Sequence, residues 1–150
     1  KYPVHVRFIE MMPIGYGSSF TGMSQEKIVS LLEERFGRLV PYEGEPLGNG
    51  PCKYYIVKGF QGKIGFISAI SHKFCSECNR IRLTSQGYLK TCLQYTAGRD
   101  LREVLRNGGT DEELKEIIKE ALSEKPDGHH FREKAKEDDT ESLCMAQIGG

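Results

Sequence analysis

The feature that most restricts how this chain can fold is a set of three cysteines on either side of one predicted β-hairpin. Cys75 and Cys78 form a Cys-x-x-Cys pair, and residues 79–91 separate this pair from Cys92. Two sulfurs of a Cys-x-x-Cys turn can converge on one metal centre, and a hairpin can return the chain so that a third sulfur arrives beside them. The spacing therefore predicts a metal site with three local thiolate ligands.

The number of ligands separates two kinds of metal site. Structural zinc sites have four closed ligands, whereas an iron–sulfur cubane held by three thiolates leaves one iron open to another ligand. The candidates for a fourth zinc ligand are His72, Cys52, Cys144, His129 and His130. Isolated cysteines are more often small buried hydrophobic residues than ligands. Spacing alone does not choose between zinc and an iron–sulfur cluster.

Two arginines follow the Cys-x-x-Cys pair closely. Arg80 and Arg82 flank Ile81 in a predicted strand, and residues i and i+2 of a strand project to the same side. Planar guanidinium groups suit phosphate oxygens, so this pair can hold the phosphates of a nucleotide while its base reaches an open iron. The alternatives are a solvated cationic strand face and part of a nucleic-acid surface. The nucleic-acid reading is disfavoured, because no other basic patch with interleaved aromatic residues occurs.

Composition excludes several broad classes of protein. The 150 residues suffice for one ordinary domain or for one domain plus part of another, and the 21 basic and 21 acidic residues cancel. No apolar run approaches the roughly 20 residues of a membrane span, and residues 1–10 lack the apolar segment of a signal peptide. Five cysteines in this arrangement fit a metal site better than a disulfide framework. We therefore expect a cytoplasmic protein without a membrane or nucleic-acid partner.

The apolar pattern of the first part of the chain predicts an α/β (α+β) fold that is incomplete. The chain does not begin with Met, and Val4–Glu10 has the pattern of a strand without a preceding element to pair with. Ser24 can cap a helix that runs to Phe36, with Gly37 at the C-cap position. Such a strand–loop–helix unit is typical of a sheet or barrel whose remainder lies outside the chain.

The second part of the chain follows a linker rich in proline and glycine at residues 40–51. Predicted strands at 54–57, 63–67, 81–84 and 88–91 form two hairpins, and a helix is predicted at 101–106. Another helix begins at the capping box Thr110-x-x-Glu113. Its apolar face consists of Leu114, Ile117, Ile118, Ala121 and Leu122. The charged segment 125–141 lacks periodicity and predicts an irregular, partly mobile tail.

Several motifs together resemble those of the GTP 3',8-cyclases, a family of molybdenum-cofactor biosynthesis. The matching segments around the cysteines are Phe74-Cys75-x-x-Cys78-Asn79-Arg80-Ile81-Arg82-Leu83-Thr84 and Gly87-x-Leu89-Lys90-x-Cys92-Leu93. Further matches are Arg7-Phe8-Ile9-Glu10-Met11-Met12-Pro13, Gly50-Pro51 and the terminal Met145-Ala146-Gln147-Ile148-Gly149-Gly150. Cys52 departs from the pattern, since a small apolar residue is expected at this position.

The resemblance implies two domains. Residues 1–40 would be the last strand–helix unit of an incomplete radical-SAM barrel of the TIM type, where SAM is S-adenosylmethionine. Residues 41–150 would be a C-terminal domain of β-hairpins and helices with an auxiliary iron–sulfur site, a GTP site and a mobile tail. Members of this family are lyases that use SAM to convert GTP to (8S)-3',8-cyclo-7,8-dihydroguanosine 5'-triphosphate.

The resemblance also implies site residues. Cys75, Cys78 and Cys92 would ligate an auxiliary 4Fe–4S cluster, and Met12 would line the SAM site. Arg80, Ile81 and Arg82 would contact GTP. The Gly149–Gly150 end can reach into an active site, because glycine permits close approach of the backbone.

The implied partners and cofactors extend beyond this chain. The family carries a second 4Fe–4S cluster on a CxxxCxxC loop, which does not occur in these 150 residues. We therefore expect the chain to bind GTP but not to cleave SAM alone. The full-length enzyme is expected to be a homodimer that supplies a downstream cyclic pyranopterin monophosphate synthase. The alternatives are a zinc-stabilised binding module, an auxiliary-cluster domain of another radical-SAM enzyme and an electron-transfer ferredoxin.

Overall fold

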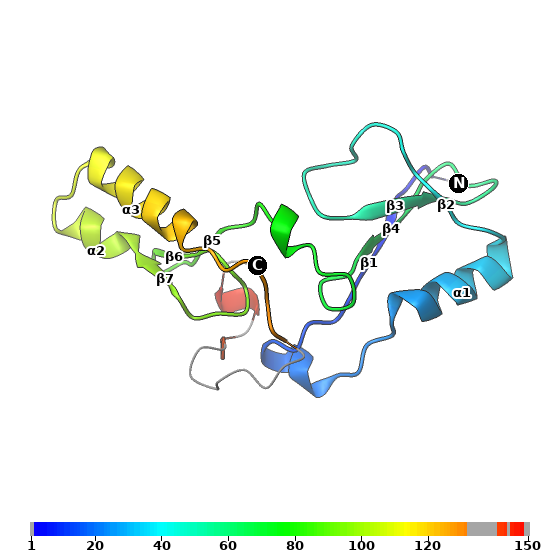
Figure 1. Cartoon of the computed structure of the whole chain (residues 1–150), viewed down its shortest axis with the longest axis horizontal. Helices are drawn as coiled ribbons and strands as arrows, with labels where there is room; N and C mark the ends of the chain where they lie inside the picture. The colour runs from blue at the N-terminus through cyan, green and yellow to red at the C-terminus, as the bar shows by residue number, and fades with distance from the viewer. Residues whose placement is uncertain (1, 132–140, 144, 149–150) are drawn as a thin grey trace. The chain divides into compact units, whose positions relative to one another are not determined.

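The protein has an α+β fold with two separate sheets (Figure 1). The computed structural model describes residues 2–131, 141–143 and 145–148. The chain divides into two compact units, of which the first comprises Lys1–Met12 and Phe20–Glu77 and the second comprises Pro13–Ser19 and Cys78–Gly150. One boundary therefore falls inside the Cys-x-x-Cys pair. The division at residue 40 that the family resemblance implies concerns the longer enzyme and stays a prediction.

The first unit contains a four-stranded sheet with the strand order β1-β4-β3-β2. Its strands are β1 (Val6–Ile9), β2 (Val40–Pro41), β3 (Lys53–Ile56) and β4 (Ile64–Ile67). The predicted hairpin of β3 and β4 is confirmed, because these strands pair in antiparallel register. The expectation that the first strand lacks a partner in this chain is wrong, because β1 pairs with β4 in parallel from Val6↔Ile64 to Ile9↔Ile67. Parallel pairing joins distant segments, so local patterning does not reveal it.

Helix α1 (Gln25–Phe36) packs its apolar face on the core of this unit. The buried core consists of Leu39, Val57, Ile64 and Phe66, and the residues packed against it are Phe8, Ile28, Val29, Leu32 and Tyr55. The Ser24 hydroxyl accepts a hydrogen bond from the Lys27 amide at 3.3 Å, which confirms the predicted N-cap. Gly37 ends the helix at a φ of 83°, where glycine is favoured. Leu31 of the same helix is exposed, so the apolar residues of α1 are only partly buried.

The second unit contains a three-stranded antiparallel sheet and two helices. Its elements are β5 (Arg82–Leu83), β6 (Tyr88–Lys90), β7 (Gly98–Asp100), α2 (Leu101–Arg106) and α3 (Asp111–Ser123). The predicted hairpin and both predicted helices are confirmed, whereas β7 was not predicted. A three-residue strand without apolar alternation gives no sequence signal. A Cβ atom at Gly98 would lie 2.2 Å from the Leu89 carbonyl oxygen, so this edge strand requires glycine.

Helix α3 begins at the predicted capping box. The Thr110 hydroxyl accepts from the Glu113 amide at 3.2 Å, and the Glu113 carboxylate accepts from the Thr110 amide at 2.7 Å. Of the predicted apolar face, Ala121 is buried while Leu122 is 44% exposed. The box fixes the start of the helix, since it satisfies two backbone donors that have no partner within the helix.

The segment predicted as an irregular, mobile tail is irregular in its described part, with no helix or strand over residues 125–131. Within this segment His129 and Glu141 are buried, whereas Asp127 and His130 are exposed. None of the helices in the described ranges is long and apolar enough to cross a membrane.

Candidate functional site

The three predicted cluster ligands lie in the segments that their spacing indicates. Cys75 begins a short 3₁₀ turn, η2 (Cys75–Glu77), in the first unit. Cys78 begins the main part of the second unit, and Cys92 follows β6 by two residues. All three are half-buried free thiols, so their donor chemistry fits either metal centre considered above.

The three thiols are divided between the two compact units. Within residues 2–131, 141–143 and 145–148, no three His, Cys, Asp or Glu side chains form a group that could hold a metal ion. Cys75 and the other two cysteines belong to different units. The three-thiol site therefore stays a prediction.

The predicted arginine pair is divided by the start of a strand. Strand β5 begins at Arg82, so Arg80 lies in the loop before it, and the prediction that both arginines share one strand is wrong. The Arg80 carbonyl oxygen accepts from Lys125 Nζ at 2.9 Å instead of from a neighbouring strand. Arg80 and Ile81 are exposed, and Arg82 is half-buried.

One hydrogen-bond donor of the Arg82 side chain lacks an acceptor within the described ranges. Its Nε atom is buried and has no hydrogen-bond partner among the described residues. Arg82 pairs with Lys90 across β5 and β6, and the charge of Lys90 is compensated elsewhere. A buried donor normally has an acceptor, so this unpartnered Nε atom is unusual for a folded protein.

Lys90 forms a buried ion pair with Glu141. Both side chains are 3% exposed, and Lys90 Nζ also donates to the Tyr95 carbonyl oxygen at 2.7 Å. Burial opposes ionisation of Glu141, but hydrogen bonds from Lys90 and from the Leu143 amide outweigh it and lower the pKa of this carboxyl group. The sequence offered only weak signals for this pair, because the two residues are far apart in the chain.

Buried Gln94 extends this polar network. Its backbone carbonyl oxygen accepts from the Glu141 amide at 2.6 Å, and its side-chain oxygen accepts from the His130 amide at 2.7 Å. His130 and Glu141, which lie on either side of residues 132–140, therefore both bind Gln94.

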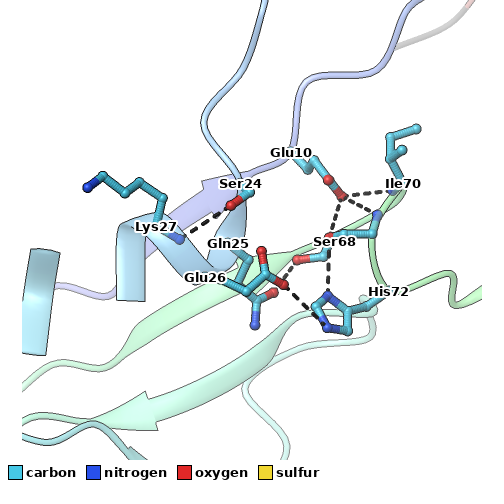
Figure 2. Close-up of polar contacts among 9 residues, drawn as sticks. Glu10, Ser24, Gln25, Glu26, Lys27, Ser68, Ile70 and His72 are labelled. Carbon is cyan, nitrogen blue, oxygen red and sulfur yellow. Dashed lines mark hydrogen bonds and ion pairs between the residues drawn. The ribbon is translucent and has the colours of Figure 1, made fainter. Parts of the chain in front are cut away.

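A second polar network lies in the first unit, next to the predicted SAM-site residue Met12, which is half-buried. Figure 2 shows its centre, where Glu10 Oε2 accepts from the amides of Ile70 and Ser71 at 2.8 and 2.9 Å. The Ser71 hydroxyl donates to the same oxygen at 3.2 Å. Glu10 follows β1 and the turn follows β4, so the network joins the carboxyl ends of two parallel strands.

The turn held by Glu10 continues toward Cys75. The His72 ring lies 3.1 Å from the Ser71 hydroxyl and 3.8 Å from the Glu26 carboxylate of α1 (Figure 2). The Ser68 hydroxyl donates to the side chain of Gln25, which also belongs to α1. The functional reading of the sequence did not include Glu10. Its position directly after a parallel strand is a signal that could have identified it.

Among the residues that the structure describes, the other candidate zinc ligands do not form a group that could hold a metal ion. Cys52 is half-buried in the first unit, where burial raises the pKa of its thiol. His129 is buried and the His130 amide donates to Gln94. Cys144, Gly149 and Gly150 lie outside the described residues.

The structure defines an α+β protein, and the family comparison places it among proteins of molybdenum-cofactor synthesis. The chain belongs to the family described as Molybdenum Cofactor Synthesis C, whose model matches residues 4–131. It is 48% identical over 151 residues to a GTP 3',8-cyclase of Clostridium perfringens (strain SM101 / Type A), covering 100% of this chain and 46% of that relative. It is 42% identical over 153 residues to a GTP 3',8-cyclase of Syntrophomonas wolfei, again covering 100% and 46%.

A third relative gives a similar result. The chain is 41% identical over 152 residues to a GTP 3',8-cyclase of Hydrogenovibrio crunogenus, covering 98% of this chain and 45% of the relative. The recognition made from the motifs is therefore confirmed, and the chain corresponds to the C-terminal portion of these relatives. It spans about half the length of the curated relatives it matches.

Proposed function

We propose that this chain is the C-terminal part of a GTP 3',8-cyclase and that it binds GTP and an auxiliary 4Fe–4S cluster. The observation that carries the proposal is the identity of 48% over the whole chain with a protein of that name. In the complete enzyme the reaction would convert GTP, with SAM, to (8S)-3',8-cyclo-7,8-dihydroguanosine 5'-triphosphate in molybdenum-cofactor biosynthesis.

Cys75, Cys78 and Cys92 would hold the auxiliary cluster. Their free, half-buried thiols support this assignment, since thiolates are the usual protein ligands of such clusters. Held by three thiolates, such a cluster would supply an iron that is open to a donor atom of the substrate. The chain's own contribution is to bind the nucleotide and to keep it oriented, which lowers the barrier to a reaction whose bond-making steps belong to the cofactors.

Arg80, Ile81 and Arg82 would contact GTP. The buried, unpartnered Nε of Arg82 supports this role, because a triphosphate oxygen would satisfy a donor whose burial costs about 1–3 kcal/mol when it has no acceptor. Arg80 is exposed in the loop before β5, so its guanidinium group is accessible to a ligand. The adjacent Ile81 offers an apolar surface that is 47% exposed.

The first unit would complete a radical-SAM barrel in the longer enzyme. The parallel pairing of β1 and β4 supports this interpretation, as does the position of β1 at the edge of its sheet. Val6 and Ile9 of this edge strand are 44% and 65% exposed, so β1 presents apolar surface to a further element. Met12 would line the SAM site, and Gly149–Gly150 would reach the active site. The second 4Fe–4S cluster, homodimerisation and a cytoplasmic location are inferred from the family.

The test is anaerobic reconstitution of this chain with iron and sulfide, followed by analysis of metal content and electron paramagnetic resonance. We expect iron with sulfide in the chain and a change in the resonance spectrum when GTP is added. Cys92→Ser should abolish this change and Arg80→Ala should weaken it, while Arg106→Ala at the end of α2 serves as a matched control. Stoichiometric zinc without sulfide would instead support a zinc-stabilised binding module.

A further inference from the structure

Lys125 contacts the loop that carries two of the proposed functional residues. Its Nζ atom donates to the carbonyl oxygen of Cys78 at 2.7 Å and to that of Arg80 at 2.9 Å. All three residues belong to the second unit. One ammonium group therefore bridges the backbone on both sides of Asn79, between the second cysteine of the Cys-x-x-Cys pair and strand β5.

The end of α3 places Lys125 at this position. The Lys125 amide donates to the Leu122 carbonyl oxygen at 3.2 Å, which continues the last turn of the helix. Ala121, one turn earlier, is 3% exposed, and the capping box at Thr110 fixes the other end of α3. The backbone of Lys125 is thus fixed by the last turn of α3, and α3 is itself fixed by its capping box and by the burial of Ala121.

The charge of Lys125 is not compensated by a carboxylate. No ion pair of Lys125 occurs in the part of the chain that the structure describes. The neighbouring Glu124 carboxylate instead accepts from Arg99 at 2.6 Å. Because neutral carbonyl groups leave the positive charge in place, Lys125 favours anionic groups near the loop, and both a thiolate-bound cluster and a triphosphate are anionic.

We propose that Lys125 is a positioning residue of the GTP site, which fixes the Cys78–Arg80 loop and adds positive charge beside it. This inference rests on the proposed function of the chain. Lys125 acts through the backbone of Cys78 and Arg80, so these two residues keep their own roles as cluster ligand and nucleotide contact. The ammonium group holds their relative placement, on which simultaneous binding of the cluster and the phosphates depends.

The test compares Lys125→Met with Lys125→Arg in the reconstituted chain. Lys125→Met should weaken GTP binding about tenfold, because it removes two charge-assisted hydrogen bonds and one positive charge. Lys125→Arg should restore most of the affinity, since a guanidinium group can donate to both carbonyl oxygens. Lys119→Met is the matched control on α3, where Lys119 pairs with Glu116 at 2.6 Å, and it should leave GTP affinity unchanged.

A second measurement separates positioning from general stability. Hydrogen exchange of the metal-free chain should show faster exchange at residues 79–82 in Lys125→Met, with α3 and β6 protected as in the parent. Unchanged exchange at 79–82 or unchanged GTP affinity would overturn the proposal, and so would loss of the fold in both Lys125→Met and Lys125→Gln. If the parent binds neither cluster nor GTP, the proposed function fails, while the exchange comparison still decides whether Lys125 fixes the loop.

Discussion

At the scale of single residues, the cations Arg82 and Lys90 differ in whether a carboxylate compensates their charge. Arg82 and Lys90 are register partners in β5 and β6, and like charges in such positions repel each other. Glu141 compensates the charge of Lys90, while no ion pair of Arg82 occurs within the described ranges. The proposed contact with GTP would compensate the charge of Arg82.

Replacing Arg82 should therefore separate binding from stability. Arg82→Met should weaken GTP binding more than about tenfold, because it removes a charge-assisted contact to phosphate. The same change should not lower the free energy of unfolding of the GTP-free chain, since the buried Nε has no partner to lose. Arg99→Met is the matched control. Because Arg99 pairs with Glu124, this change should leave GTP affinity unchanged. A destabilised chain with unchanged GTP affinity would show that Arg82 has only a structural role.

The Glu141 carboxyl group should make stability depend on pH. Its pKa in the folded chain lies below the ordinary value of 4.5, so its contribution is present above that value and is lost as the pH falls through the lowered pKa. Breaking a buried ion pair by removing one partner costs about 3–5 kcal/mol. At neutral pH, Glu141→Gln should lower the free energy of unfolding in urea by this order, and the difference from the parent should shrink as the pH falls below 4.5 and through the lowered pKa. A difference that is constant with pH would contradict this account.

At the scale of elements, the helices were easier to predict than the pairing of strands. Ser24 and Thr110 mark helix starts by hydrogen bonds to amides three residues away, so a short sequence window contains the whole signal. The pairing of β1 with β4 joins residues that are far apart in sequence, and β7 has no apolar pattern. The contacts of Lys125 and Glu141 were missed for the same reason, because their partners lie far away in the chain.

The turn after β4 should depend on the glutamate after β1. Glu10→Ala removes the acceptor of the Ile70 and Ser71 amides, so exchange of these two amides should become faster, and the chain should lose about 1.5–3 kcal/mol of stability. We also expect less iron after reconstitution, because this turn leads to Cys75. Glu34→Ala, at an exposed position of α1, is the control. Unchanged exchange of the two amides in Glu10→Ala would refute the role of this carboxylate.

At the scale of the whole molecule, the chain contains only part of the residues and cofactor motifs that the proposed reaction needs. The family and the three candidate thiol ligands could be predicted from the sequence, because short motifs of neighbouring residues contain both signals. The gathering of the three thiols at one metal centre, which their spacing predicts, stays a prediction, because Cys75 lies in one compact unit while Cys78 and Cys92 lie in the other. The chain also corresponds to 46% of the length of its relative from Clostridium perfringens.

The absence of a CxxxCxxC motif from these 150 residues predicts that the chain does not cleave SAM alone. Reconstituted and reduced chain, incubated with SAM and GTP, should yield no 5'-deoxyadenosine by chromatography. The longer enzyme of a relative serves as the positive control. Formation of 5'-deoxyadenosine by the isolated chain would mean that its cysteines support radical generation, and the division of roles proposed above would be wrong.

The most direct test of the central claim is pulsed electron paramagnetic resonance of the reduced, reconstituted chain with GTP that carries ¹⁵N in its guanine ring. If three thiolates leave one iron open to the nucleotide, the spectrum should contain a hyperfine coupling between the cluster and a guanine ¹⁵N nucleus. This coupling should disappear with unlabelled GTP. A fully loaded cluster that binds GTP without any such coupling, or that has a fourth side-chain ligand from this chain, would contradict the account.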